Sequence, residues 1–145
     1  MINLKKNIPE YSSRETRNKF ISIKFLNYLS GSVLNVGGGG KKHLSKYIKS
    51  KEYMELDIDG EPDLLINLDQ EFPLPIEDKR YNTVICSDVL EHLNDFHRVF
   101  SELIRVSNRY VIISLPNCLP VFYQYLRRQK YIPGNSDSSN SQHGR

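Results

Sequence analysis

The sequence predicts an α/β domain built on a doubly wound, mostly parallel β-sheet with helices on both faces. Apolar stretches of strand length alternate along the chain with stretches of helical periodicity, an order that is typical of right-handed β-α-β connections. Residues 83–87 form a nearly continuous apolar run, as expected of a strand buried in a parallel sheet. The strand expected at residues 32–36 runs directly into four glycines, Gly37 to Gly40. Glycines at the carboxyl end of a strand let a ligand approach the backbone closely.

The N-terminal part predicts one long amphipathic helix before the first strand. Ser12 and Glu15 have the spacing of a capping box, with Ser12 as the N-cap and Glu15 at the third helical position. Apolar residues then recur at helical spacing as far as Gly31, which is a plausible stop. We therefore expect a helix over residues 13–30, followed by the strand over residues 32–36.

The middle of the chain predicts a short helix and three further strands. Residues 42–49 carry Leu44, Tyr47 and Ile48 at the spacing of one helix face. The strands are expected at residues 53–58, 64–66 and 83–87.

The C-terminal part predicts a helix, a fifth strand and a second helix. Asp95 can cap a helix whose apolar residues share one face, namely Phe96, Val99, Phe100, Leu103 and Ile104. The fifth strand is expected at residues 110–115 and an amphipathic helix at residues 121–130. The polar composition of residues 134–141 predicts a mobile tail. We divide the chain into a domain over residues 1–131, with a nucleotide-binding core over residues 32–117, and a tail over residues 132–145.

Composition excludes several classes of protein. The chain has 145 residues, enough for one domain with a genuine core, and a net charge of +3, too small to indicate a nucleic-acid partner. No apolar run approaches the roughly 18 residues of a membrane span, and the N-terminus lacks the apolar stretch of a signal peptide. Cys86 and Cys118 have neither metal-ligand nor disulfide spacing. We expect a cytoplasmic protein without a metal site or a membrane segment.

The glycine turn admits four interpretations. A P-loop needs a first glycine where Asn35 stands and a serine or threonine where Lys42 stands. A dinucleotide fingerprint needs a third glycine, again at residue 42. A turn that binds nothing needs only one or two glycines, because each costs unfolded-state entropy. The fourth interpretation is a nucleoside-containing cofactor whose ribose is bound by Asp57, at the end of the next strand.

The ordered motifs resemble those of class I S-adenosylmethionine-dependent methyltransferases. Residues 33–40 look like the first motif of this family, V-L-D-[LIV]-G-x-G-x-G, and residues 53–58 look like its second strand with the ribose-binding acid. Residues 72–82 resemble its L-P-F-P-D-N-S-F-D stretch, and residues 83–93 are close to its V-V-I-C-S-E-V-L-E-H-L stretch. Residues 111–117 are similar to the fifth strand of the type 11 and methionine-biosynthesis-like subgroups.

The resemblance covers residues 30–120 and implies a Rossmann-like fold with S-adenosylmethionine as the cofactor. Gly37, Gly38 and Gly39 would lie beneath its methionine and ribose parts, and Asp57 would accept hydrogen bonds from both ribose hydroxyls. Either Asn67 or Asp69 would contact the adenine amino group, and Asp59 is a weaker substitute for Asp57. The other cofactor contacts are expected at Asn35, Ile58, Leu68, Ser87, Asp88 and Val89.

His92 is the candidate catalytic residue. Histidine titrates near neutrality and can act as a general base, although a packing role under the active-site loop is the alternative. Methyl transfer from a sulfonium is an in-line displacement, in which alignment of cofactor and acceptor supplies much of the acceleration. A base is needed only if the acceptor must lose a proton. We expect a small-molecule or carbohydrate-related acceptor.

The sequence departs from the family at Asn35 and Asn82, where the family has aspartates, and at Lys41, where it has the last glycine. Fewer carboxylates should weaken attraction for a cationic sulfonium. No further pair of strands follows Leu115, which predicts a truncated domain without the family's last two strands. Its fifth strand would be an exposed edge, open to pairing with a second copy. The alternative functions are an inactive, partial methyltransferase-like module that serves in binding or dimerisation, and a nicotinamide-dependent enzyme.

Overall fold

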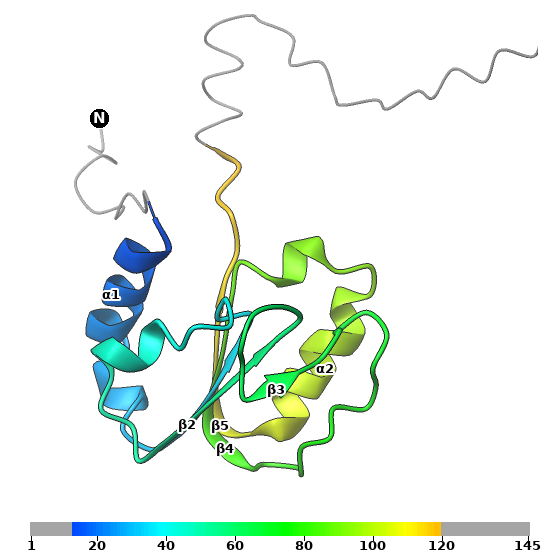
Figure 1. Cartoon of the computed structure of the whole chain (residues 1–145), viewed down its shortest axis with the longest axis horizontal. Helices are drawn as coiled ribbons and strands as arrows, with labels where there is room; N and C mark the ends of the chain where they lie inside the picture. Colours follow the sequence, from blue (N-terminus) through cyan, green and yellow to red (C-terminus); the bar gives the residue numbers. More distant parts are fainter. Residues whose placement is uncertain (1–12, 120–145) are drawn as a thin grey trace, which may run out of the picture. The chain divides into compact units, whose positions relative to one another are not determined.

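The computed structural model of the chain describes residues 13–119 (Figure 1). Ser12, the helix predicted at residues 121–130 and the tail predicted at residues 132–145 lie outside the described residues. The contacts divide the chain into Met1–Leu115 and Pro116–Arg145, and the strands found in residues 13–119 belong to the first unit. Within residues 13–119, no helix combines the length and the apolar character needed to cross a membrane.

A five-stranded parallel sheet forms the centre of the first unit. Its strands lie in the order β3-β2-β1-β4-β5. Because β1 has β2 on one side and β4 on the other, the carboxyl ends of β1 and β4 flank a topological switch point, where open α/β sheets bind their ligands. The bounds are β1 (Ser32–Val36), β2 (Glu52–Asp57), β3 (Leu64–Leu65), β4 (Tyr81–Ser87) and β5 (Ser107–Ser114).

Helices cover both faces of the sheet, which confirms the predicted doubly wound fold. On one face, α1 (Arg14–Lys24) and the single-turn helix η3 (Leu44–Tyr47) contribute Ile21 and Leu44 to a core around Val33 and Ile85. On the other face, α2 (Phe96–Val106) packs against alternate residues of the same strands. This second core contains Leu34, Val36, Val84, Cys86, Val99, Leu103 and Val106. Since side chains alternate along a strand, β1 and β4 supply both cores.

The N-terminal helix differs from its prediction in length and in its cap. The N-cap is Ser13, whose Oγ accepts from the Thr16 N–H at 3.2 Å, while Thr16 Oγ1 accepts from the Ser13 N–H at 3.1 Å. The predicted partner Glu15 instead pairs with Lys19, one turn along the helix, at 2.7 Å. The helix ends at Lys24, and a separate turn, η2 (Leu26–Tyr28), follows where one continuous helix was predicted.

The helix predicted at residues 42–49 is reduced to the turn η3. Lys42 has a left-handed backbone with a φ of 49°, and Ile48 is already extended, so no longer helix can form between them. Leu44 and Ile48 are nevertheless buried as predicted. Each strand overlaps its predicted range, but β4 begins at Tyr81 rather than at residue 83. Strand β5 begins at Ser107 rather than at residue 110 because α2 passes directly into it.

The buried stripe of α2 is narrower than its apolar sequence suggested. Val99, Leu103 and Val106 face the sheet, whereas Phe96, Phe100 and Ile104 lie on a neighbouring stripe and are exposed. Strand β5 is the last in the sheet order, so among the described residues its outer edge has no strand partner. Pairing of this edge with a second copy stays a prediction.

The cap of α2 offers a test of how its helix is held. Asp95 Oδ1 accepts a hydrogen bond from the Arg98 N–H at 3.1 Å. We expect Asp95→Ala to lower the free energy of unfolding by about 1 kcal/mol, the usual contribution of such a cap. Urea denaturation measures this difference, and Asp95→Asn, which keeps a capping oxygen, is the matched control. Equal stability of the two variants would contradict the assigned cap.

Candidate functional site

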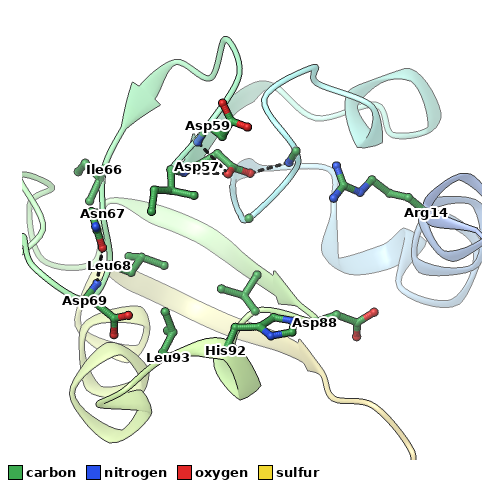
Figure 2. A pocket seen from close by; sticks show the side chains of 14 residues that line it. Arg14, Asp57, Asp59, Ile66, Asn67, Leu68, Asp69, Asp88, His92 and Leu93 are labelled. Carbon is green, nitrogen blue, oxygen red and sulfur yellow. Dashed lines mark hydrogen bonds between the residues drawn. The ribbon is translucent and has the colours of Figure 1, made fainter. Parts of the chain in front are cut away.

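A cavity of about 400 Å³ opens at the carboxyl edge of the sheet, beside the switch point (Figure 2). This volume is typical of pockets for small organic ligands. Most of the predicted site residues line it: Gly37, Gly39, Asp57, Ile58, Asn67, Leu68, Asp69, Asp88, Val89 and His92. The sequence therefore brings residues from four separate stretches of chain to one place.

The glycine turn between β1 and η3 forms one side of the cavity. Gly37 and Gly39 have φ angles of 74° and 92°, in the left-handed region that favours glycine. The Gly37 N–H donates to the Leu56 carbonyl at 2.8 Å, which fixes the turn to β2. A Cβ at Gly37 would lie 2.1 Å from Val89 Cγ2, so residue 37 has neither the backbone nor the space for a side chain.

Asp57 ends β2 with its carboxylate held by backbone donors. Its Oδ2 accepts from the Gly39 N–H at 2.6 Å, and its Oδ1 accepts from the N–H groups of Ile58 and Asp59 at 2.8 Å and 3.3 Å. A carboxylate offers about four acceptor positions. Asp57 therefore keeps capacity to accept a hydrogen bond from a hydroxyl group in the cavity.

The opposite end of the cavity lies in the loop after β3. Ile66 and Leu68 are almost fully buried and give this end apolar surface. Asn67 Oδ1 accepts from the Asp69 N–H at 3.0 Å, and the Asp69 carboxylate accepts from the backbone and side-chain nitrogens of Asn94. An apolar wall flanked by fixed acceptors suits a flat heterocycle that carries an amino group.

Asp88 follows β4, lines the cavity and is fixed from two sides. It forms an ion pair with Arg17 of α1, and its Oδ1 accepts from Ser114 Oγ of β5 at 2.7 Å. Ser114 Oγ also lies 2.6 Å from Ser87 Oγ, so Ser87 is connected to Asp88 through Ser114. Ser87 is not among the residues that line the cavity. Asp88 itself has a φ of 54°, which these contacts stabilise.

His92 and Leu93 complete the wall after β4. His92 ends the turn η4 (Leu90–His92), is exposed to solvent, and has its Nε2 3.9 Å from Glu91 Oε1.

Burial raises the pKa of the nearby Cys86 thiol to about 12, with Glu91 and Asp88 adding to the effect. Cys86 is therefore a core residue rather than a nucleophile.

Arg14 is a site residue that the sequence interpretation missed. It starts α1 and lines the cavity beside the glycine turn, where a Cβ at Gly39 would lie 1.5 Å from Arg14 Nη1. The ion pairs described in residues 13–119 do not include Arg14. The cavity that it faces is also lined by four acids, Asp57, Asp59, Asp69 and Asp88. No cofactor-binding motif includes Arg14, so only its place in the fold identifies it. Ile66 and Leu93 also line the cavity and were not predicted.

Two predicted cofactor contacts lie beneath the turn rather than in the cavity. The Asn35 side chain is buried, and its Nδ2 donates to Tyr53 Oη at 3.0 Å and to Glu55 Oε2 at 3.3 Å. Gly38 rests on this group: a Cβ there would lie 2.2 Å from Glu55 Oε2. Neither residue is among those that line the cavity.

Comparison with known proteins adds a family to this geometry. A family model described as "Methyltransferase domain" matches residues 34–113. A solved structure of an S-adenosylmethionine-dependent methyltransferase from Aquifex aeolicus is 21% identical in sequence. The match covers 72% of this chain and 67% of that one, with a TM-score of 0.51. This similarity shows that the two chains share a fold.

A structure from Bacillus halodurans, provisionally described as a methyltransferase, is 22% identical over 76% of this chain, with a TM-score of 0.47. The match spans 55% of that protein's length. No curated protein matches the sequence.

Proposed function

Because the chain belongs to the methyltransferase-domain family, we propose that it transfers a methyl group from S-adenosylmethionine to a small-molecule or carbohydrate-related acceptor. The observation that carries the proposal is the meeting of the glycine turn and Asp57 at one end of the cavity, with Asn67 and Asp69 at the other. A nucleoside with an amino-acid substituent has a hydroxylated centre and two polar ends, and the cavity offers partners for each. We also propose a cytoplasmic location.

The residues present fit such a cofactor. Asp57 would bind the ribose hydroxyls, and the Asn67–Asp69 loop would bind the adenine. The guanidinium of Arg14, beside Gly39, would pair with the cofactor's carboxylate. The acids that line the cavity would favour its cationic sulfonium and ammonium groups.

Bound S-adenosylmethionine supplies an electrophilic methyl group. The protein's task is then to align an acceptor with that methyl group and to exclude competing water. Asp88 and Val89, which follow β4, line the cavity, and the acceptor would enter beside them. His92 would take a proton from an acceptor hydroxyl where one must be lost.

Calorimetric titration with S-adenosylhomocysteine tests the cofactor assignment. We expect saturable binding of one molecule per chain, because the product retains the ribose, the adenine and the amino-acid group. The absence of binding at millimolar ligand, with circular dichroism showing a folded chain, would overturn the proposed function.

The role of Arg14 can be isolated by the choice of ligand. We expect Arg14→Ala to weaken S-adenosylhomocysteine binding about tenfold, the value of one charge-assisted hydrogen bond. Binding of methylthioadenosine, which lacks the amino-acid group, should not change. Lys24→Ala, at the other end of α1, is the control for net charge. Equal losses for both ligands would show that Arg14 does not contact the carboxylate.

The proposed role of His92 predicts a change in turnover without a change in cofactor affinity. We expect His92→Ala to bind S-adenosylhomocysteine within about threefold of the wild type, because the exposed ring would contact the acceptor rather than the cofactor. Production of S-adenosylhomocysteine from a pool of hydroxylated small molecules should fall about 100-fold, within the usual range for a general base. An unchanged rate would indicate that His92 only packs against the loop.

A second candidate function is an inactive module that pairs through β5, favoured by the outer edge of that strand, which is unpaired among the described residues. Antiparallel pairing of two copies would extend the sheet across a two-fold axis. Sedimentation velocity of the full chain tests this candidate: a dimer without nucleoside binding would support it, and a monomer that binds S-adenosylhomocysteine would contradict it.

A further inference from the structure

A buried carboxylate lies directly beneath the glycine turn. Glu55, on β2, is fully buried and accepts three hydrogen bonds from different parts of the chain. Its Oε2 accepts from Tyr53 Oη at 2.9 Å and from Asn35 Nδ2 at 3.3 Å, and its Oε1 accepts from the Lys42 N–H at 3.1 Å. A carboxylate in such a place is tolerated only when its oxygens are satisfied in this way.

These bonds connect Glu55 to both ends of the turn. Asn35 lies two residues before Gly37, and Lys42 lies two residues after Gly40. The turn also packs directly on the carboxylate, since a Cβ at Gly38 would lie 2.2 Å from Glu55 Oε2. The path of the turn, and with it the position of Gly39 against Asp57, therefore depends on residue 55.

The rest of the network holds Lys42 in a conformation that favours glycine. Its φ is 49°, and its ammonium group binds Asp63 Oδ1 at 2.5 Å. Asp63 Oδ2 in turn accepts from the Glu55 N–H at 2.9 Å. Glu55 thus accepts a hydrogen bond from the Lys42 N–H, and Asp63 binds both the Glu55 N–H and the Lys42 ammonium group. These bonds explain how a lysine is held in a left-handed backbone conformation.

The donors to Glu55 are all neutral. Burial, together with the adjacent Glu55, raises the pKa of the Tyr53 phenol far above its usual range, so Tyr53 stays a donor. No ion pair described in residues 13–119 includes Glu55. The charge of this carboxylate is therefore not neutralised by a basic side chain. Because Glu55 lies beneath the glycine turn, it would attract a cation bound on the other side of the turn, in the cavity.

The position of Glu55 also accounts for Asn35. Residues 35 and 55 are partners in the β1–β2 register, and the family that the chain resembles carries an aspartate at residue 35. An aspartate there would place two carboxylates about 3.3 Å apart, which is unfavourable for both charges. With asparagine, the same contact becomes a hydrogen bond.

We propose that Glu55 supplies the acid beneath the glycine turn in place of residue 35, and that it is a positioning residue for the amino-acid end of the cofactor. This inference rests on the proposed function for its ligand. Its structural part, the exchange of roles between residues 35 and 55, is independent of any ligand.

A four-member set of proteins tests the proposal: the wild type, Asn35→Asp, Glu55→Gln and the double variant. In each single variant, residues 35 and 55 carry the same kind of group. Two carboxylates face each other in Asn35→Asp, and two amides face each other in Glu55→Gln. The double variant restores one acid and one amide. We expect both single variants to melt at lower temperature than the wild type, and the double variant to recover most of the loss. A double variant that melts no higher than the less stable single variant would overturn the exchange.

Ligand binding by the same set tests the positioning role. We expect Glu55→Gln to weaken S-adenosylhomocysteine binding about tenfold and methylthioadenosine binding less than threefold, with the double variant within threefold of the wild type for both. Equal losses for the two ligands, or no recovery in the double variant, would overturn the positioning role. If the wild type binds neither nucleoside, the proposed function fails, whereas the melting temperatures still decide the exchange.

Discussion

Replacing Asp57 with alanine is expected to weaken S-adenosylhomocysteine binding about 10- to 100-fold, since one hydrogen bond to a charged group contributes roughly 1.5–3 kcal/mol. Asp57 lies beside the glycine turn, and its carboxylate also accepts a hydrogen bond from the Gly39 N–H at 2.6 Å. Alanine removes both the ribose partner and the bond that closes the turn. Calorimetry with S-adenosylhomocysteine measures the loss, and circular dichroism establishes that the variant is folded.

Two further variants separate the parts of this effect. Asp57→Asn keeps the shape of the side chain but turns one acceptor into a donor, so we expect an intermediate loss of affinity. Asp59→Asn is the matched control, because Asp59 also lines the cavity but bonds the Gly60 N–H at 2.6 Å. We expect it to retain affinity within about threefold, since the proposed ribose acceptor is Asp57 and one oxygen of Asp59 is already occupied by the Gly60 N–H. A larger loss for Asp59→Asn than for Asp57→Asn would move the ribose site to Asp59.

The choice of ligand distinguishes Asp57 from Arg14. Methylthioadenosine retains the ribose but lacks the amino-acid group, so Asp57→Ala should weaken both ligands whereas Arg14→Ala should weaken only one. The two ends of the cofactor are therefore assigned independently. A chain that bound an unrelated anion through Arg14 would not produce this pattern.

The fold was predictable because apolar runs and their alternation with helical stretches directly reflect burial. Strand β1 has its predicted bounds, Ser32–Val36, and Asp95 caps α2 as its side-chain chemistry predicted. The helix expected at residues 42–49 was not predictable as a turn, because the left-handed backbone of Lys42 depends on bonds to Glu55 of β2 and to Asp63, which precedes β3. Long-range contacts override local periodicity at such positions.

The same limit applies to the candidate site. Gly37, Gly39 and Asp57 could be predicted because backbone freedom and a strand-end acid are local properties of the sequence. The pairing of Asn35 with Glu55 could not, since it depends on the register of β1 against β2. From the sequence alone, Asn35 suggested a weakened cofactor site. In the structure, Glu55 lies next to Asn35, and we propose that it takes the place of the aspartate expected at residue 35. Asn35→Asp is therefore expected to damage the site rather than to restore it.

Substituting Gly37 should have the largest effect on the fold and the site together. Gly37→Ala combines a left-handed residue, which costs about 1–2 kcal/mol, with an overpacked contact, which costs about 1–3 kcal/mol, because the new methyl group would lie 2.1 Å from Val89 Cγ2. We expect the free energy of unfolding to fall by about 2–5 kcal/mol, the sum of these two costs. Binding of S-adenosylhomocysteine should be lost, since the turn and Val89 both line the cavity.

A double variant separates the clash from the backbone strain. In the double variant Gly37→Ala with Val89→Ala, the clashing methyl group is absent, and urea denaturation should show that the overpacking cost is recovered while the strain remains. If the double variant were no more stable than Gly37→Ala, steric contact with Val89 would not be the reason for glycine at residue 37. The turn would then be fixed by its backbone conformation alone, and the space above it would be free for a ligand even with a side chain present.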